Sequence, residues 1–304
     1  MIDMSSFVET GVHHLEHRVD SFAARELLRA VHNDRAFGPG LFMAERDFKA
    51  NPVFKGVNPR LGRNLAEKLH DLTLFVDDDP VVRQALSVVL GEGYSVMDKK
   101  FVCGIPQEWI PDWVKQYIVE TGVKNLGPYM RPEYRDITYF SGIDFHQDII
   151  DWPSMGPKFI TLYVYLDDVG LKDAPLHVMP GTHVLGATCF PHALEHLGAE
   201  RWRYTTDIGE FGEFSHHVLV GSAGDISFWH PFILHGTQPD ANSEPRISLR
   251  YLIGMADPDC LADCELRRAN ERIAGHMALD RTREDLGESG QTILKGNHVN
   301  KLGY

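Results

Sequence analysis

Residues 224–254 read GDISFWHPFILHGTQPDANSEPRISLRYLIG. Short runs of β-branched and aromatic residues alternate here with Gly, Pro, Asp and Asn, which is the pattern of β-strands separated by turns. We interpret the stretch as two strands joined by a polar turn, with His235 near the end of the first and Arg246 on the returning strand. It predicts a β-rich fold.

The same alternation recurs upstream, whereas residues before Gly93 show the spacing of amphipathic helices. Helical patterns cover 20–32, 65–75 and 79–91, and the last has Asp79 as cap and Pro80 at the first helical position. A mainly β fold with flanking helices follows, with a jelly-roll barrel as its core. Its strands are expected near 94–103, 135–141, 159–167, 176–179, 216–221, 225–229, 232–235 and 246–253.

The 304 residues are expected to form a single domain, 1–304, because the helical and strand-rich parts complete one barrel. Residues 12–93 would form a helical buttress and 94–255 the barrel core. Within the core, residues 104–134 are rich in proline and aromatic residues and are interpreted as a lid or an interface. Residues 256–304 are expected to be a helical tail that could pair subunits into a homo-oligomer.

The amino-acid composition limits the classes of molecule that the protein is expected to bind. A hydrophobic content of 43% and a charged content of 24% are typical of a soluble globular protein. The net charge of −13 disfavours nucleic acid and anionic membrane surfaces as partners, but it does not indicate a substrate. Four cysteines are too few for a disulfide framework, and neither a signal peptide nor an apolar stretch of ~20 residues is present, so we expect a cytoplasmic protein.

A metal site is predicted from three residues. His146 and Asp148 are two apart, so on a strand they would point to the same face. His235 adds a second imidazole, and two nitrogens with one oxygen suit iron(II) while leaving positions for an oxoacid and dioxygen. His230 is the competing ligand, but its odd offset from His235 turns it to the opposite face. His32 and Asp34 repeat the spacing within a helical pattern, where such residues do not face each other.

A carboxylate anchor is predicted on the returning strand. Arg246 follows His235 by eleven positions and shares a face with Ser248. The planar guanidinium of arginine binds a carboxylate through two parallel hydrogen bonds. Arg250 lies on the same face and competes for this role. We favour Arg246 because of its spacing and its neighbouring hydroxyl.

These motifs resemble the phytanoyl-CoA dioxygenase family of iron(II)- and 2-oxoglutarate-dependent oxygenases. The resemblance covers about residues 12–255. Two departures concern Asp173 and Ala174, which replace the family's small polar-glycine step, and residues 104–134, which look longer than usual. The matching stretches are HQD at 146–148, APLHVMPGTH at 174–183, GDISFWHPFILHG at 224–236, and Arg246.

The resemblance implies a double-stranded β-helix of the cupin-like kind, with iron(II), 2-oxoglutarate and dioxygen as cofactor and cosubstrates. It implies that His146, Asp148 and His235 are catalytic metal ligands. Arg246 and Ser248 would hold 2-oxoglutarate. Further candidates are Thr237 and Tyr163 for the cosubstrate, and Gln147 and Trp152 for the substrate.

The implied reaction is the oxidation of a small or medium organic substrate, such as a secondary metabolite or an amino acid, with release of succinate and carbon dioxide. Asp148 favours hydroxylation, because halogenating relatives have a small residue at this position. Two alternatives stay open: a cupin-like metal-dependent hydrolase or isomerase without 2-oxoglutarate, and a non-catalytic barrel that serves as a binding module.

Overall fold

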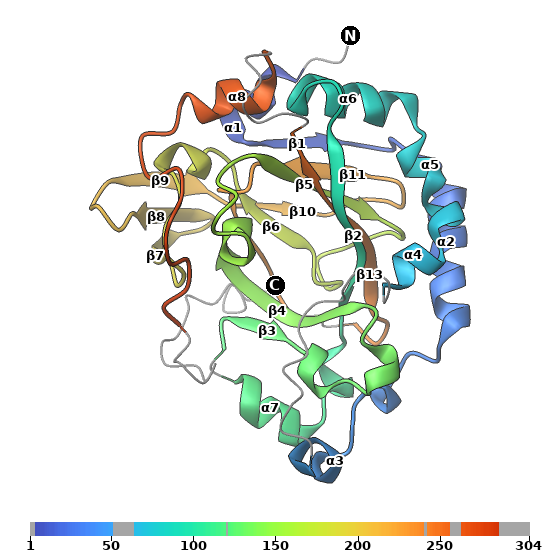
Figure 1. Cartoon of the computed structure of the whole chain (residues 1–304). Helices are drawn as coiled ribbons and strands as arrows, with labels where there is room; N and C mark the ends of the chain where they lie inside the picture. Colours follow the sequence, from blue (N-terminus) through green and yellow to red (C-terminus); the bar gives the residue numbers. More distant parts are fainter. Residues whose placement is uncertain (1–3, 51–63, 120, 240–241, 256–262, 286–304) are drawn as a thin grey trace.

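A computed structural model describes residues 4–50, 64–119, 121–239, 242–255 and 263–285, and every structural statement below concerns these residues. At its centre, ten strands form one curled, mixed sheet, a half-barrel of the jelly-roll class (Figure 1). The strands run in the order β1-β11-β5-β13-β2-β4-β12-β6-β10, with β3 beside β4, and β2 and β4 are parallel. Their bounds are β1 Val12–Leu15, β2 Ser95–Gly104, β3 Val123–Asn125, β4 Thr138–His146, β5 Phe159–Tyr165, β6 Leu176–Met179, β10 His217–Leu219, β11 Ile226–Trp229, β12 Leu234–Thr237 and β13 Arg246–Gly254.

Side-chain alternation along the central strands separates a helix-facing side from a cavity-facing side. On β13, the apolar residues Ile247, Leu249 and Tyr251 belong to the largest core cluster, together with residues of the helices. The alternate residues Arg246 and Arg250 line a pocket instead. The same division holds on β2, β5 and β11. One face of the sheet therefore packs against helices, and the other contributes side chains to the pocket.

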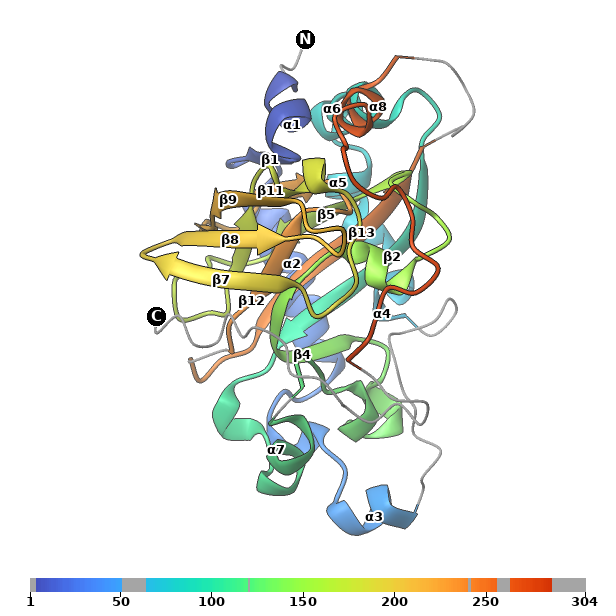
Figure 2. The same ribbon diagram turned by 90° about the vertical axis from the view of Figure 1, so that its left-hand side faces the viewer.

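Helices α2, α4, α5 and α6 pack against the outer face of the sheet, whereas α3 and α7 lie beyond its lower end (Figures 1 and 2). Two of them begin where the sequence predicts: Asp20 caps α2 by accepting from the Phe22 amide, and Asp79 caps α6 by accepting from the amides of Val81 and Val82. The pattern at 65–75 is broken into three short turns. The helices are α1 Ser5–Thr10, α2 Ser21–Asp34, α3 Glu45–Ala50, α4 Leu65–Lys68, α5 Leu74–Asp77, α6 Pro80–Leu90, α7 Asp112–Ile118 and α8 Glu265–Asn270. The 3-10 turns are η1 Pro39–Leu41, η2 His70–Thr73, η3 Gln107–Trp109, η4 Gly127–Tyr129, η5 Pro132–Tyr134, η6 Asp148–Asp151 and η7 Thr182–Leu185.

Two predicted strands are displaced. The strand expected at 135–141 is β4, residues 138–146, because the preceding residues form η5. The strand expected at 232–235 is β12, residues 234–237, because Pro231 follows β11 at a turn and has no amide hydrogen for a strand ladder. The prediction at 216–221 shortens to β10, and that at 176–179 matches β6.

The sequence prediction missed several strands. β1 lies inside the region expected to be helical and pairs with β11. A separate three-stranded sheet, β7 Ala193–Gly198, β8 Arg201–Thr205 and β9 Phe211–Ser215, was also missed, although polar and aromatic residues alternate along β8 as they do in a strand. It projects from the side of the half-barrel (Figure 2).

The segment 104–134 forms η3, α7, β3, η4 and η5, and none of its described residues lines the pocket. Its aromatic rings Trp113 and Tyr129 pack against Phe48 of α3, at ring-centroid distances of 5.2 and 5.3 Å. The helix predicted in the tail is short, residues 265–270, while its beginning at 260–262 and residues 286–304 lie outside the described residues.

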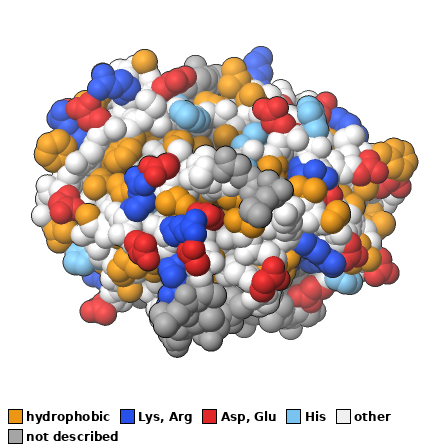
Figure 3. All heavy atoms as spheres, turned by 90° about the horizontal axis from the view of Figure 1, so that it is seen from above, with side chains coloured by type: hydrophobic (Ala, Val, Ile, Leu, Met, Phe, Trp, Pro, Cys, Tyr) orange, Lys and Arg blue, Asp and Glu red, His pale blue; other side chains and the backbone are white. Residues whose placement is uncertain are grey.

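No helix in the described part of the chain is both long and apolar enough to cross a membrane. On the face seen from above, acidic and basic side chains are interspersed among apolar ones (Figure 3).

Candidate active site

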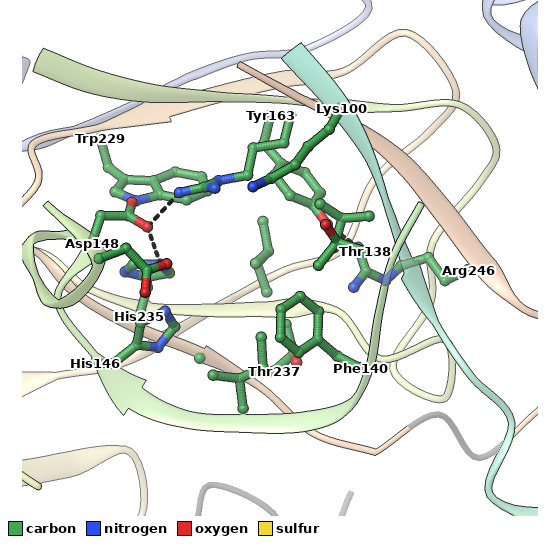
Figure 4. Close-up of a pocket in the computed structure, with 16 residues that line it drawn as sticks. Lys100, Thr138, Phe140, His146, Asp148, Tyr163, Trp229, His235, Thr237 and Arg246 are labelled. Atoms are coloured by element: carbon green, nitrogen blue, oxygen red, sulfur yellow. Dashed lines mark hydrogen bonds and ion pairs between the residues drawn. The ribbon is translucent and has the colours of Figure 1, made fainter. Parts of the chain in front are cut away.

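The candidate site is a pocket on the concave face of the sheet, where seven strands and η6 contribute residues (Figure 4). Histidine and carboxylate groups gather at one side of it, and Arg246 reaches in from the opposite side. The lining residues are Lys100, Val102, Thr138, Phe140, Ile143, His146, Asp148, Asp151, Tyr163, Leu176, Trp229, His235, Gly236, Thr237, Arg246 and Arg250.

Two imidazoles and one carboxylate meet at this pocket. His146 ends β4 and lies directly opposite His235 on β12, with their ring centroids 4.2 Å apart. Asp148 adds a carboxylate, and the three potential ligand atoms lie within 4.8 Å of one another. The expectation that Asp148 lies on a strand is wrong, because β4 ends at His146 and Asp148 begins η6. The turn, rather than strand parity, directs its carboxylate to the imidazoles.

Backbone carbonyls orient both imidazoles. Nδ1 of His146 donates to the carbonyl of Asp144 over 2.9 Å, and Nδ1 of His235 donates to that of Ile233 over 3.0 Å. A carbonyl only accepts, so each ring carries its hydrogen on Nδ1 and leaves the Nε2 lone pair free for a metal. Burial, followed by the neighbouring His235, lowers the pKa of His146 to about 3, and burial lowers the pKa of His235. Both rings are neutral at pH 7.

Three donors hold the Asp148 carboxylate. Its Oδ1 accepts from Arg250 over 2.7 Å, and its Oδ2 accepts from Thr161 over 2.5 Å and from the indole of Trp229 over 2.9 Å. Burial acts to raise the pKa of Asp148, but the Arg250 guanidinium and the two imidazoles hold it far below its usual range. The group is therefore a carboxylate whose Oδ2 is occupied, which directs Oδ1 toward His235, 3.6 Å away.

The donor set fits a divalent metal ion. Two neutral nitrogens and one carboxylate oxygen on one side of the ion match the arrangement of non-haem iron(II) oxygenases, which leaves the remaining positions open. Among the described residues, this trio is the one cluster of histidine, cysteine and acidic side chains with such spacing.

A second cluster surrounds the predicted carboxylate anchor. Nη1 of Arg246 donates to the hydroxyls of Tyr163, 2.7 Å away, and Ser248, 3.0 Å away. These hydroxyls keep the guanidinium in place at the end of the pocket away from the histidines. Thr237 lines the same pocket. A carboxylate-bearing molecule that reaches from the metal ligands to Arg246 would fit this arrangement.

The structure separates the two arginines that competed for the anchor. Arg250 contacts Asp148, whereas Arg246 lies among hydroxyl groups. It also separates the competing histidines, since His230 accepts from the Phe232 amide through Nδ1 and hydrogen-bonds Asn270 through Nε2. His230 is therefore occupied outside the pocket.

Two predicted substrate contacts do not line the pocket. The Gln147 amide donates to the carbonyls of Gly186 and Phe232 and accepts from the Thr188 amide, at 2.9 to 3.0 Å, and its side chain is fully buried. Trp152 is half-buried and packs against an apolar cluster around Phe159.

Sequence reasoning missed Thr161, Trp229 and Lys100, and it did not foresee the contact of Arg250 with Asp148. Each of these residues lies on a predicted strand, and two of them share a strand face with a recognised site residue: Thr161 with Tyr163, and Arg250 with Arg246. Strand parity could have placed them on the cavity side. It could not have told which of them meet, because that depends on pairing between strands distant in sequence.

Comparison with known proteins assigns the fold and the motif to one family. The family described as "Phytanoyl-CoA dioxygenase (PhyH)" matches residues 45–248, two thirds of the chain. The chain belongs to the phytanoyl-CoA dioxygenase family. It is thus a member of the iron(II)- and 2-oxoglutarate-dependent oxygenases, and all of the pocket-lining side chains except Arg250 fall within the matched residues.

Among individual members of this class, a "Probable alpha-ketoglutarate-dependent hypophosphite dioxygenase" of Stutzerimonas stutzeri is 29% identical over 127 residues. That match covers 38% of this chain and 40% of the relative. The crystal structure of the non-heme alpha ketoglutarate dependent epimerase SnoN from nogalamycin biosynthesis has a TM-score of 0.50 at 14% identity, covering 92% of this chain and 95% of that one. EvdO2 from Micromonospora carbonacea var. aurantiaca follows at a TM-score of 0.49 and 17% identity, with coverages of 85% and 95%.

Proposed function

We propose that this phytanoyl-CoA dioxygenase family protein hydroxylates a small or medium organic substrate at an iron(II) ion held by His146, Asp148 and His235. The observation that carries the proposal is the convergence of two Nε2 lone pairs and one fixed carboxylate oxygen. With iron(II) bound there, dioxygen would be the oxidant: one of its oxygen atoms would go to the succinate formed as 2-oxoglutarate loses carbon dioxide, and the other to the hydroxylated substrate.

The protein's own residues bind and orient the reactants. Arg246 would bind the far carboxylate of 2-oxoglutarate through its guanidinium, which Tyr163 and Ser248 hold in place. Thr237 would add a hydroxyl to the same molecule. The apolar residues of the pocket exclude water from the oxidation.

The proposal favours hydroxylation because the carboxylate of Asp148 fills the third ligand position with an oxygen. A halogenating site would need that position for chloride. Two alternatives are a metal hydrolase without 2-oxoglutarate and a non-catalytic barrel. Neither of them requires a carboxylate-binding arginine such as Arg246 with its hydroxyl partners. Membership in a 2-oxoglutarate-dependent family also disfavours both.

The first test uses light absorption. Iron(II) and 2-oxoglutarate, added to the protein without oxygen, are expected to give a visible metal-to-ligand charge-transfer band. Asp148→Ala should abolish or greatly weaken the band, whereas Asp71→Ala, at an exposed carboxylate outside the pocket, should leave it intact. A normal band in Asp148→Ala would disprove the metal assignment.

The second test separates the arginines. Arg246→Ala should weaken 2-oxoglutarate binding by roughly 2 kcal/mol, about 30-fold, because a charged hydrogen-bond pair is lost. Arg250→Ala should mainly affect the metal, since Arg250 contacts Asp148. If only Arg250→Ala weakens 2-oxoglutarate binding, the anchor is assigned to the wrong arginine. If neither does, the 2-oxoglutarate site is wrong.

The substrate can be found by measuring succinate release over a broad panel of metabolites. The panel should include amino acids, secondary metabolites and hypophosphite, since the bacterial relative carries that substrate in its name. Succinate that rises with one compound, together with a product heavier by one oxygen atom, would support hydroxylation. A product lighter by two hydrogens would show desaturation instead.

A further inference from the structure

A second cationic cluster lies in the pocket, apart from Arg246. Lys100 on β2 and Arg250 on β13 are direct cross-strand partners, and both line the cavity. Lys100 is only 4% exposed, and the Arg250 side chain is 12% exposed. The Lys100 ammonium points into the pocket toward the side that holds Asp148 and His235 (Figure 4).

This pairing is unfavourable for the fold by itself. Like charges directly opposite each other on antiparallel strands repel, and burying a charge costs more when its partners are few. Burial, followed by the charge of Arg250, lowers the pKa of Lys100. Two buried cations side by side lower the stability of the fold, and proteins usually keep such an unfavourable arrangement where it serves a function.

Two acidic side chains form ion pairs with these cations, and Asp151 lines the pocket beside both of them. In the described part of the chain, Lys100 has an ion pair with Asp98, 3.1 Å away, and Arg250 has one with Asp148, 2.7 Å away. An ammonium has three N–H donors and a guanidinium has five, so each group can offer further donors to a molecule in the pocket.

The cationic pair also lies away from the proposed cosubstrate anchor. On the paired strands, Arg246 faces Gly104 while Arg250 faces Lys100, four residues farther along. At about 3.3 Å per residue, the two levels are roughly 13 Å apart along the strand. Arg250, the cross-strand partner of Lys100, contacts the proposed metal ligand Asp148.

From this geometry we infer that Lys100, with Arg250 beside it, binds an anionic group of the organic substrate. The inference rests on the proposed function and names the substrate class: a small organic acid, such as a carboxylate or phosphonate, that is oxidised at a C–H bond near its anionic group. Phe140 lies across the pocket from Lys100 and provides an apolar surface for the rest of the molecule (Figure 4).

The test measures binding to the wild-type protein loaded with iron(II) and saturated with 2-oxoglutarate in the absence of oxygen, so that Arg246 is occupied. Propionate, methylphosphonate and the neutral propionamide are titrated by calorimetry, and the charge-transfer band is followed in parallel. We expect at least one anion to bind in the millimolar range and to shift the band, while propionamide does neither.

The variant Lys100→Met should weaken anion binding about tenfold or more, because a charged hydrogen bond is lost, and should leave the affinity for 2-oxoglutarate unchanged. Lys100→Arg should retain anion binding. Lys172→Met, which removes an exposed lysine, is the matched control. If Lys100→Met does not fold, Lys100→Gln replaces it, since glutamine keeps a hydrogen-bond donor without the charge.

Three results would overturn the inference: equal binding of propionamide and propionate, unchanged anion binding in the Lys100 variant that lacks the charge, or a loss of 2-oxoglutarate affinity in that variant. The last would assign Lys100 to the cosubstrate. Absence of the charge-transfer band in the wild type would overturn the proposed function, whereas a normal band without anion binding overturns this inference alone.

Discussion

The guanidinium of Arg250 donates to Oδ1 of Asp148 over 2.7 Å, and that same oxygen lies 3.6 Å from Nε2 of His235. The same carboxylate oxygen thus accepts a hydrogen bond from a permanent cation and lies near the proposed metal position. Oδ2 is occupied by Thr161 and Trp229, so the carboxylate cannot rotate without losing hydrogen bonds. Its orientation is set before any metal binds.

Replacing Arg250 should destabilise the metal-free protein. Arg250→Met leaves the buried charge of Asp148 without its cation, and breaking such a pair costs about 3 kcal/mol. Urea unfolding measures the loss, and Arg203→Met, at a more exposed arginine of β8, is the control. Added divalent metal should recover part of the stability, because the ion replaces the missing charge. Equal stability of Arg250→Met and the wild type would contradict the role given to this pair.

The indole hydrogen bond to Asp148 should strengthen metal binding. Trp229→Phe removes the donor of the 2.9 Å bond and keeps most of the ring, so we expect the metal affinity to fall about tenfold. Competition with a chromophoric chelator measures this affinity. Trp202→Phe is a matched control, because its indole also donates over 2.9 Å, but to His216. Similar losses in both variants would point to general destabilisation.

Gly236 should tolerate no side chain, because β12 passes close to β4. A Cβ there would lie 2.6 Å from the carbonyl oxygen of Ile143 and 3.2 Å from that of Asp144. Gly236→Ala is expected to cost about 2 kcal/mol of stability and to displace the adjacent His235, weakening metal binding. Gly40→Ala, which meets no atom within 4 Å, serves as the control. Thermal unfolding with and without metal checks both effects, and an unchanged metal affinity would disprove the displacement.

Acid should destabilise the protein through its buried imidazoles. Burial, followed by His183, lowers the pKa of His230 to about 3, compared with about 6.5 in an unfolded chain. Between these values the unfolded state binds the extra proton, so this contribution to stability is complete above pH ~6.5 and declines toward pH ~3.

His230→Gln should therefore reduce the slope of unfolding free energy against pH by up to about 1.4 kcal/mol per pH unit within that window. Urea unfolding at several pH values gives the slope, and the exposed His196→Gln is the control. If His230→Gln keeps the wild-type slope, the histidine is protonated in the folded state as readily as in the unfolded one.

Several helices, strands and site residues could be predicted from local sequence patterns. The cap at Asp79 and the β-branched runs follow from neighbouring residues, so helix α6 and strand β13 lie where expected. His235 and Arg246 are only eleven positions apart in the sequence. The trio His146, Asp148 and His235 was predicted from residue types, and the structure brings it together, although its Asp148 comes from a turn.

The sequence by itself determined the alternation of apolar and polar residues along each strand, and hence which side chains share a face, because that depends only on the period of the backbone. Only the tertiary structure decided which strands are neighbours. The order β5-β13-β2 places Arg250 between Lys100 and Tyr163, residues 150 and 87 positions away in the chain. Such contacts arise when the whole sheet curls and buries its apolar face, which no local pattern encodes.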